Sequence, residues 1–285
     1  MITKKIIAAK AEEYNIPFAN LLAGCVCENL ISILSTEDQS SELWLCNAED
    51  FDIKVYATSE KRNLYYQYCG DLDCKYQVLY LRDVLKMLTS KGLNCFDNIE
   101  GTVEDYGIRL SITVDEMYVP VVIYIRSHTT ERISFDLSTI RMSLEEDMIV
   151  SCKSYPKEQI ICDHITEIID KLELINETER YYEVYEILST YPINGRKVRE
   201  TLGITYSDMD RSALLKRLNT IKGYKDYTYM KKKWKVVLRQ KKTSEPEWSD
   251  VVICFYSFVN PIVESIIQNT IFLGDWMPQL KRFLD

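Results

Sequence analysis

The first 36 residues carry apolar side chains at the spacing of two helices. Residues 2–14 form one amphipathic stretch, and Asn15-Ile16-Pro17 interrupts it with a proline that suits a first helical turn. After Phe18 a second stripe repeats with a period close to that of a helix, through Leu21, Leu22, Val26, Leu30, Ile31 and Leu34. We therefore expect two N-terminal helices that are separated at Pro17.

Short apolar runs dominate the segment that follows. Gly107 to Val114 alternates between aliphatic and polar residues, as a half-buried strand does. Val119 to Ile125 is almost wholly apolar, which is typical of a buried central strand. We predict a helix over residues 80–89, stopped at Gly92, and strands over residues 43–46, 51–57, 65–68, 74–78, 107–114, 119–125 and 132–137.

The pattern changes to helical spacing after Tyr155-Pro156. One helix face is predicted between Ile160 and Leu172, and another helix over residues 181–188. The remaining residues up to 285 also favour helices. We predict an α+β protein with an N-terminal α/β domain over residues 1–155 and a helical C-terminal domain over residues 156–285.

The composition favours a soluble protein of the cytoplasm. The chain has 285 residues, of which 46% are hydrophobic, enough for one large core or two smaller ones. The two longest apolar runs, 119–125 and 251–259, are far shorter than the roughly 20 residues that span a bilayer, so we expect no membrane segment. Nine cysteines cannot all pair, and we see no secretory signal, so we expect free thiols in a reducing compartment.

Positive charge is concentrated in one part of the chain. Residues 211–242, the basic segment, hold twelve lysines and arginines and one acid, Asp226, although the whole chain has a net charge of −8. Such a surface suits phosphate backbones or an acidic partner protein, and charge does not choose between RNA, DNA and protein. Cysteine spacing gives no zinc motif, and the chain has only two histidines.

Three passages, in this order, resemble the AbiEii/AbiGii-type nucleotidyltransferase toxins of type IV toxin–antitoxin and abortive-infection systems. The first is Tyr14-Asn15-Ile16-Pro17-Phe18, followed by a helix through Cys27-Glu28-Asn29-Leu30. The second is Tyr155-Pro156-Lys157-Glu158 with Arg180-Tyr181-Tyr182-Glu183-Val184-Tyr185, similar to the family's Y-P-x-E and K-D-x-Y-D-I-Y helices. The third is Lys233-Trp234 with the segment 255–261.

The resemblance implies a nucleotidyltransferase-like N-terminal domain with a mixed sheet, which would transfer a nucleoside monophosphate from an NTP to a tRNA, another RNA or a protein acceptor. That chemistry needs Mg²⁺, held by carboxylates. A D-x-D pair suits this task, because alternate residues of an extended segment point the same way. Asp71 and Asp73 match the family's pair, Asp50-Phe51-Asp52 is a competing match, and Arg62 is a candidate phosphate contact.

A third metal-binding carboxylate is expected from a later strand. Asp136 fits the local pattern of the family's I-D-I strand, so Asp71, Asp73 and Asp136 form the predicted catalytic and metal-binding set. By spacing from Gly107, the position falls instead on Tyr124, which would leave no third acid.

Several positions depart from the family's pattern. The phosphate-binding turn aligns with Asn47-Ala48-Glu49, whose side chains are larger and include an acid. The family's lysine after Y-P-x-E falls at His164, and its lysine–aspartate pair at Glu179-Arg180, where Arg180 is still a candidate phosphate contact; the second aspartate falls at Glu183.

These observations leave hypotheses of different classes open. An active toxin would hold Mg²⁺ and an NTP, and would bind RNA through the basic segment, with Lys231, Lys232, Lys233 and Trp234 as candidate contacts. A catalytically degenerate protein would keep the fold and dock an acidic partner, such as an antitoxin. A weaker alternative is a DNA-binding regulator that uses residues 207–219 as a recognition helix.

Overall fold

The computed structural model describes residues 2–70, 74–127, 135–145 and 147–284. The chain divides into two compact units, Met1–Pro156 and Lys157–Asp285, and the predicted boundary lies one residue away. Each unit has its own cluster of buried apolar side chains. The mixed α+β class predicted from the sequence is confirmed.

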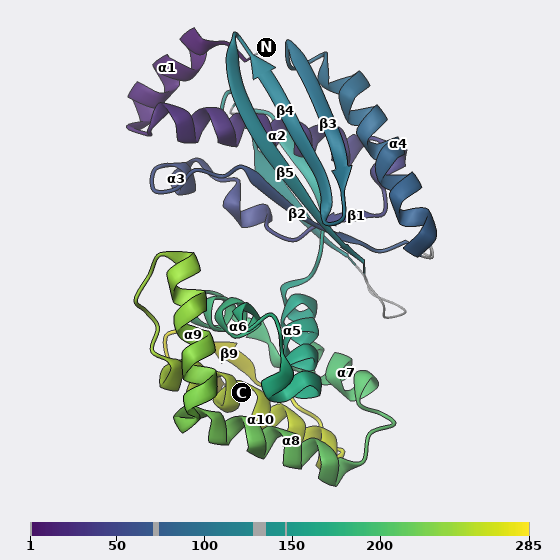
Figure 1. Ribbon diagram of the computed structural model, residues 1–285, viewed down its shortest axis with the longest axis vertical. Coiled ribbons are helices and arrows are strands. Elements are labelled where there is room, and N and C mark those ends of the chain that lie inside the picture. The colour runs from purple at the N-terminus through teal and green to yellow at the C-terminus, as the bar shows by residue number, and fades with distance from the viewer. Residues whose placement is uncertain (1, 71–73, 128–134, 146, 285) are drawn as a thin grey trace. The chain divides into compact units, whose positions relative to one another are not determined.

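A seven-stranded mixed sheet organises the N-terminal unit (Figure 1). Its strand order is β3-β4-β5-β2-β1-β7-β6. The strand bounds are Leu43–Leu45 (β1), Asn63–Tyr68 (β2), Asn98–Glu104 (β3), Gly107–Val114 (β4), Met117–Ser127 (β5), Asp136–Arg141 (β6) and Ile149–Ser154 (β7). β2 pairs with β5, and β1 with β7, in parallel, while the other pairs are antiparallel. β2 therefore lies inside the sheet, between β5 and β1.

Two long helices bury their apolar stripes against this sheet. α2 and α4 contribute Leu30, Val84 and other aliphatic side chains to the same buried cluster as the strands. In Figure 1, α2 runs behind the sheet. The helical bounds in this unit are Lys4–Tyr14 (α1), Phe18–Thr36 (α2), Asp38–Ser40 (η1), Ala48–Asp50 (η2), Ile53–Tyr56 (α3) and Cys74–Gly92 (α4).

The opposite face of the sheet is polar and aromatic. In β4, Ile108 and Leu110 are fully buried, whereas Arg109 between them is exposed. In β5, Tyr118 lies on the same side as Arg109 and is 63% exposed. This alternation is the period of two that a sheet with one covered face requires.

Helices form most of the C-terminal unit. Their bounds are Lys157–Lys171 (α5), Leu172–Leu174 (η3), Glu179–Thr190 (α6), Gly195–Thr205 (α7), Arg211–Gly223 (α8), Tyr224–Asp226 (η4), Thr228–Lys241 (α9) and Trp248–Gln268 (α10). A small antiparallel sheet, ordered β10-β9-β8, joins Ile193–Asn194 (β8), Asp275–Met277 (β9) and Arg282–Leu284 (β10). Phe255, Phe258 and Trp234 are among the largest fully buried side chains.

Two of the predicted strands are wrong. The predicted strand at 51–57 contains helix α3, and the predicted strand at 74–78 is the first part of α4. The strand predicted at 132–137 falls partly outside the described residues, and β6 begins at Asp136. The small C-terminal sheet was not predicted.

Two helices, α2 and α10, are long and apolar enough to cross a membrane by length and composition. The core helix of a soluble protein has the same properties, and both helices supply many residues to the buried clusters of their units.

Candidate functional site

The predicted pair Asp71 and Asp73 lies outside the described residues. Its place in the chain is still defined by its neighbours, because β2 ends at Tyr68 and α4 begins at Cys74. The pair thus connects the carboxyl end of an inner strand to a helix. Nucleotide-binding loops of α/β proteins commonly occupy this kind of connection.

The two candidates for the third-acid position, Asp136 and Tyr124, lie on different strands. Asp136 is exposed at the start of β6, an edge strand, and β1 and β7 lie between it and β2. At the usual strand spacing, β6 runs about 14 Å from β2. Tyr124 lies on β5 directly opposite Tyr65 of β2, with the two rings stacked at 5.1 Å. The position beside β2 is therefore aromatic, and Asp136 lies on a strand remote from β2.

The described residues contain no group of three or more His, Cys, Asp or Glu side chains that could hold a metal ion. The predicted Mg²⁺ site consequently depends on Asp71 and Asp73. It remains a prediction, because neither residue is described.

The turn that aligns with the family's phosphate turn is held by its own side chain. The Asn47 amide oxygen accepts the backbone N–H of Tyr65 at 3.0 Å. Its amide nitrogen donates to the Asp50 carboxylate at 2.9 Å and to the Asn63 carbonyl at 3.2 Å. Asn47 thus fixes the turn to the edge of β2, which is a structural role.

The competing D-x-D pair also has structural roles. Asp50 forms an ion pair with Lys61 at 2.6 Å. Asp52 caps the first turn of α3, accepting the backbone N–H of Lys54 at 2.8 Å. Both carboxylates therefore have partners within the fold, and neither needs a metal ion to balance its charge.

Arg62 retains unused hydrogen-bonding capacity. One terminal nitrogen pairs with Glu60 at 2.5 Å. Its Nε is shielded from solvent and has no hydrogen-bond partner among the described residues. Arg62 therefore keeps the donor that a phosphate contact would need.

A cluster of charged side chains joins α5 and α6 in the C-terminal unit. Arg180 is 7% exposed and contacts Glu167 at 3.0 Å, Glu183 at 2.7 Å and Glu177. His164 Nε2 lies 3.1 Å from Glu183. Burial raises the pKa of Glu167, but hydrogen bonds from Lys171 and Arg180 outweigh it and leave that pKa below its ordinary value.

This cluster brings together positions that the resemblance marks as altered. The resemblance placed His164 in one motif and Arg180 and Glu183 in another, and the packing of α5 on α6 brings His164 into contact with Glu183. Three carboxylates already surround the Arg180 guanidinium, and they would repel an incoming phosphate. The surroundings of Arg180 thus favour a structural role over the predicted phosphate contact.

The basic segment forms α8, η4 and α9, and three of its cations serve the fold. Arg217 donates to the carbonyls of Ile169 at 3.0 Å and Asp170 at 2.8 Å. Lys233 donates to the carbonyls of Glu173 at 3.0 Å and Ile175 at 2.7 Å. Lys241 pairs with Glu179. Lys233, a predicted substrate contact, is therefore already engaged.

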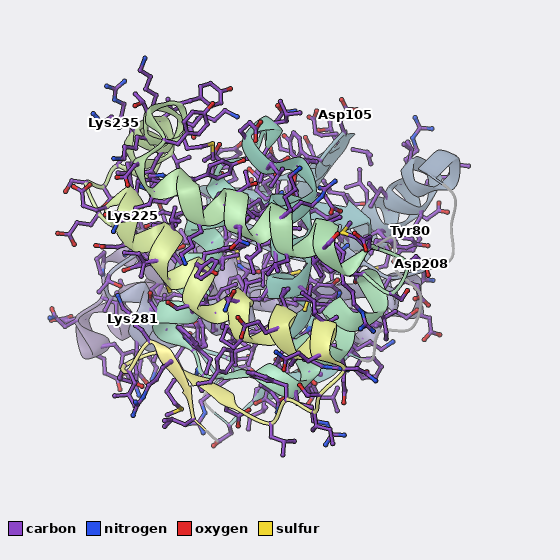
Figure 2. All side chains as sticks on the ribbon, turned by 90° about the horizontal axis from the view of Figure 1, so that it is seen from below. Tyr80, Asp105, Asp208, Lys225, Lys235 and Lys281 are labelled. Carbon is purple, nitrogen blue, oxygen red and sulfur yellow. The ribbon has the colours of Figure 1, made fainter. Side chains whose placement is uncertain are left out.

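The other nine cations of the segment are exposed, namely Arg211, Lys216, Lys222, Lys225, Lys231, Lys232, Lys235, Arg239 and Lys242. We call them the basic surface. Figure 2 marks Lys225 and Lys235 on the α9 side of this unit. Among the described residues, Lys232 and Lys235 have no ion-pair partner, so their charges face solvent.

Exposed aromatic rings accompany the basic surface. Tyr227 and Tyr229 are 44% and 47% exposed, and their ring centroids lie 6.0 Å apart. Tyr224, stacked on Tyr227 at 5.7 Å, is buried. Trp234, a predicted stacking residue, is only 2% exposed and donates Nε1–H to the Pro246 carbonyl at 2.9 Å. Trp234 therefore belongs to the core, and the available rings are those of Tyr227 and Tyr229.

Sequence reasoning missed a buried acid in the N-terminal unit. Glu28 of α2 is 1% exposed and accepts the Tyr56 hydroxyl at 2.8 Å and the Ser143 backbone N–H at 2.8 Å. Burial raises the pKa of Glu28 to about 7, against the opposing effect of the hydrogen bonds from Ser143 and Tyr56. The resemblance had marked Glu28 only as part of a helix motif.

No family model and no curated protein matches this chain.

Proposed function

We propose that this chain is a divergent nucleotidyltransferase-like protein of a toxin–antitoxin or abortive-infection system, and that its basic surface binds the phosphate backbone of an RNA. The observation that carries this proposal is that residues 211–242 hold nine exposed cations, in a chain whose net charge is −8. A surface of this kind attracts a polyanion through counterion release.

The exposed tyrosines favour RNA over an acidic protein. Tyr227 and Tyr229 are partly exposed beside the lysines of α9, and Lys233 Nζ lies 5.0 Å from the centre of the Tyr229 ring. Unpaired bases stack on such rings, whereas an acidic protein partner would need only the charges. A tRNA, with its single-stranded loops and end, has the matching chemistry.

The remaining observations favour binding over catalysis. Asp136 lies on an edge strand, the Asn47 turn is fixed by its own side chain, and Arg180 is surrounded by carboxylates. Each of these positions would have a role in the phosphate chemistry of an active enzyme. We infer a retained architecture with reduced chemistry, acting in the cytoplasm, where the eight described cysteines remain free thiols.

Two double variants, each of which removes two positive charges, test the proposal. Lys232→Gln/Lys235→Gln removes two cations of the basic surface, and Lys4→Gln/Lys5→Gln removes two exposed lysines of α1. Fluorescence anisotropy with labelled tRNA would measure both affinities. We expect the α9 variant to bind at least about tenfold more weakly and the α1 variant to bind like the unmodified protein.

Equal weakening by the two variants would indicate only nonspecific attraction and would contradict the proposal. A protein that binds no RNA, but whose α9 lysines are needed to retain an acidic antitoxin, would establish the protein-docking alternative instead.

The second candidate function is Mg²⁺-dependent nucleotidyl transfer. The position of Asp71 and Asp73 favours it, because they follow the inner strand β2 and precede α4. Mg²⁺ commonly uses one or two carboxylates together with substrate phosphates, so this pair would suffice for a minimal site. Arg62, with its unused Nε, is the candidate phosphate contact.

Calorimetric titration of each NTP, with and without Mg²⁺, tests the catalytic candidate. Mg²⁺-dependent binding that disappears in Asp71→Ala/Asp73→Ala would support it, and labelled NTPs would then be screened against tRNA. If the folded protein binds no NTP, the enzyme candidate fails and the RNA-binding proposal is unaffected.

A further inference from the structure

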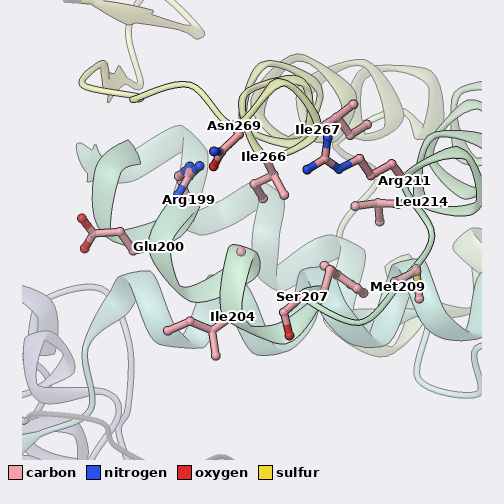
Figure 3. Close-up of a pocket in the computed structure, with 12 residues that line it drawn as sticks. Arg199, Glu200, Ile204, Ser207, Met209, Arg211, Leu214, Ile266, Ile267 and Asn269 are labelled. Carbon is pink, nitrogen blue, oxygen red and sulfur yellow. The ribbon is translucent and has the colours of Figure 1, made fainter.

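A hollow lies between three helices of the C-terminal unit. It has a volume of about 420 Å³ and is lined by α7, the turn before α8, α8 itself and the end of α10. Small-molecule sites commonly fall within this range of volume. Figure 3 shows Arg199 and Arg211 reaching it from different helices, on either side of Ile266.

The two arginines lack partners among the described residues. The Nε of Arg199 is shielded from solvent and makes no hydrogen bond, and neither guanidinium forms an ion pair. A shielded donor without an acceptor costs free energy, and an anionic ligand would supply the missing acceptor.

Two acids beside the hollow are already engaged. Asp210 caps α8, accepting the backbone N–H of Ala213 at 3.1 Å. Glu200 lines the hollow and pairs with Arg196 at 2.9 Å. The end of α10 is closed by its own backbone, because the N–H of Asn269 donates to the Ile266 carbonyl at 3.2 Å. These contacts leave Arg199 and Arg211 available.

We propose that this hollow binds a phosphate monoester. Near neutral pH such a group carries a charge between −1.5 and −2 and three acceptor oxygens, so it can engage two guanidinium forks at once. A single carboxylate has only two oxygens and can pair with only one guanidinium group in this way. The apolar wall formed by Ile204, Leu214 and Ile266 would contact the carbon atoms of the ester.

The phosphate has two possible sources with the same chemistry. It is either the terminal phosphate of an RNA, held beside the basic surface that begins at Arg211, or the phosphate of a small molecule. Arg199 lies on α7, outside the basic segment. A substitution of Arg199 therefore tests this site independently of the basic surface.

Calorimetric titration of the full chain with inorganic phosphate tests the site. We expect binding that weakens at least about tenfold in Arg199→Gln, because a charge-assisted hydrogen bond is lost. Lys197→Gln removes one exposed charge from the same helix, away from the hollow, and should bind like the unmodified protein. Arg211→Gln, at an exposed position, provides a second variant if Arg199→Gln fails to fold.

The same RNA oligonucleotide with a 5′-phosphate and with a 5′-hydroxyl identifies the source. A preference for the phosphorylated form that disappears in Arg199→Gln assigns the site to an RNA end. Binding of inorganic phosphate without such a preference assigns it to a small molecule. Absence of phosphate binding, or equal binding by the unmodified protein and Arg199→Gln, would overturn the proposal while leaving RNA binding by Lys232 and Lys235 intact.

Discussion

At the scale of single residues, several polar side chains that the sequence marks for chemistry are held by their neighbours. Asn47 fixes a turn to β2, Lys233 donates to two carbonyls, and Arg180 pairs with three carboxylates. Such partners lie up to 60 positions away in the chain, as for Lys233 and Glu173. Residue type and local spacing therefore indicate a candidate, and tertiary packing decides whether its charge is free.

The charge cluster between α5 and α6 predicts a large structural effect of Arg180. Arg180→Met should lower the free energy of unfolding by about 3 kcal/mol, because three neighbouring carboxylates lose the buried guanidinium that offsets their mutual repulsion. Urea denaturation measures the change. Arg180→Met/Glu183→Gln, which also removes one of those charges, should recover part of the loss. An Arg180→Met protein of unchanged stability that no longer binds NTP would favour the phosphate role instead.

Glu28 predicts a pH dependence of stability in the N-terminal unit. Its pKa in the folded protein is about 7, above the ordinary value of 4.5, so folding favours the protonated form. The stabilisation is complete below the ordinary pKa and is lost as pH rises through the folded pKa, by up to about 3 kcal/mol.

Glu28→Gln isolates this contribution. A glutamine can accept the Ser143 N–H and donate to the Tyr56 hydroxyl, but it does not titrate. The free energy of unfolding of the unmodified protein, measured at about pH 5 and about pH 8, should fall more steeply between these values than that of the variant. Parallel pH profiles would show that Glu28 is ionised throughout.

At the scale of elements, strong periodicity predicts structure well and short apolar runs do not. α2, β4 and β5 appear within two residues of their predicted bounds. Phe51, Ile53 and Val55 alternate as in a strand, yet Asp52 caps a helical turn there. Tyr56 in that turn reaches Glu28, a contact that no local pattern reveals.

Helix α9 shows which part of the candidate site could be predicted from sequence. The density of positive charge correctly located an exposed basic surface. It did not separate exposed from buried aromatic residues, because Trp234 lies on the buried face of α9 and Tyr229 on the exposed one. The exposed face is set by the packing of α9 against α6, which local sequence does not reveal.

The two faces of α9 predict separable effects. Tyr227→Ala/Tyr229→Ala should weaken binding of single-stranded RNA about tenfold or more, because base stacking is lost, with little change in the unfolding midpoint. Trp234→Phe should lower stability, because the Nε1–H bond to Pro246 is lost, and should leave RNA affinity unchanged. Anisotropy and thermal unfolding of the three proteins measure both quantities. A loss of RNA affinity confined to Trp234→Phe would contradict the assignment.

At the scale of the whole molecule, the chain consists of two units with separate cores and different charges. The basic surface belongs to the C-terminal unit, while the predicted D-x-D pair belongs to the N-terminal unit. The proposed binding of RNA and any chemistry at Asp71 and Asp73 would therefore depend on different units. Substitutions in the basic surface should therefore leave NTP affinity unchanged, and substitutions of Asp71 and Asp73 should leave RNA affinity unchanged.

The salt dependence of RNA binding by the unmodified protein tests the central claim most directly. If about five phosphates contact the basic surface, the logarithm of the association constant should fall with the logarithm of salt concentration with a slope of about −3.5. Lys232→Gln/Lys235→Gln removes two of these contacts and should make the slope less steep by about 1.4. Lys4→Gln/Lys5→Gln should leave the slope unchanged. A slope near zero, or one that the α9 substitutions do not alter, would contradict RNA binding by this surface.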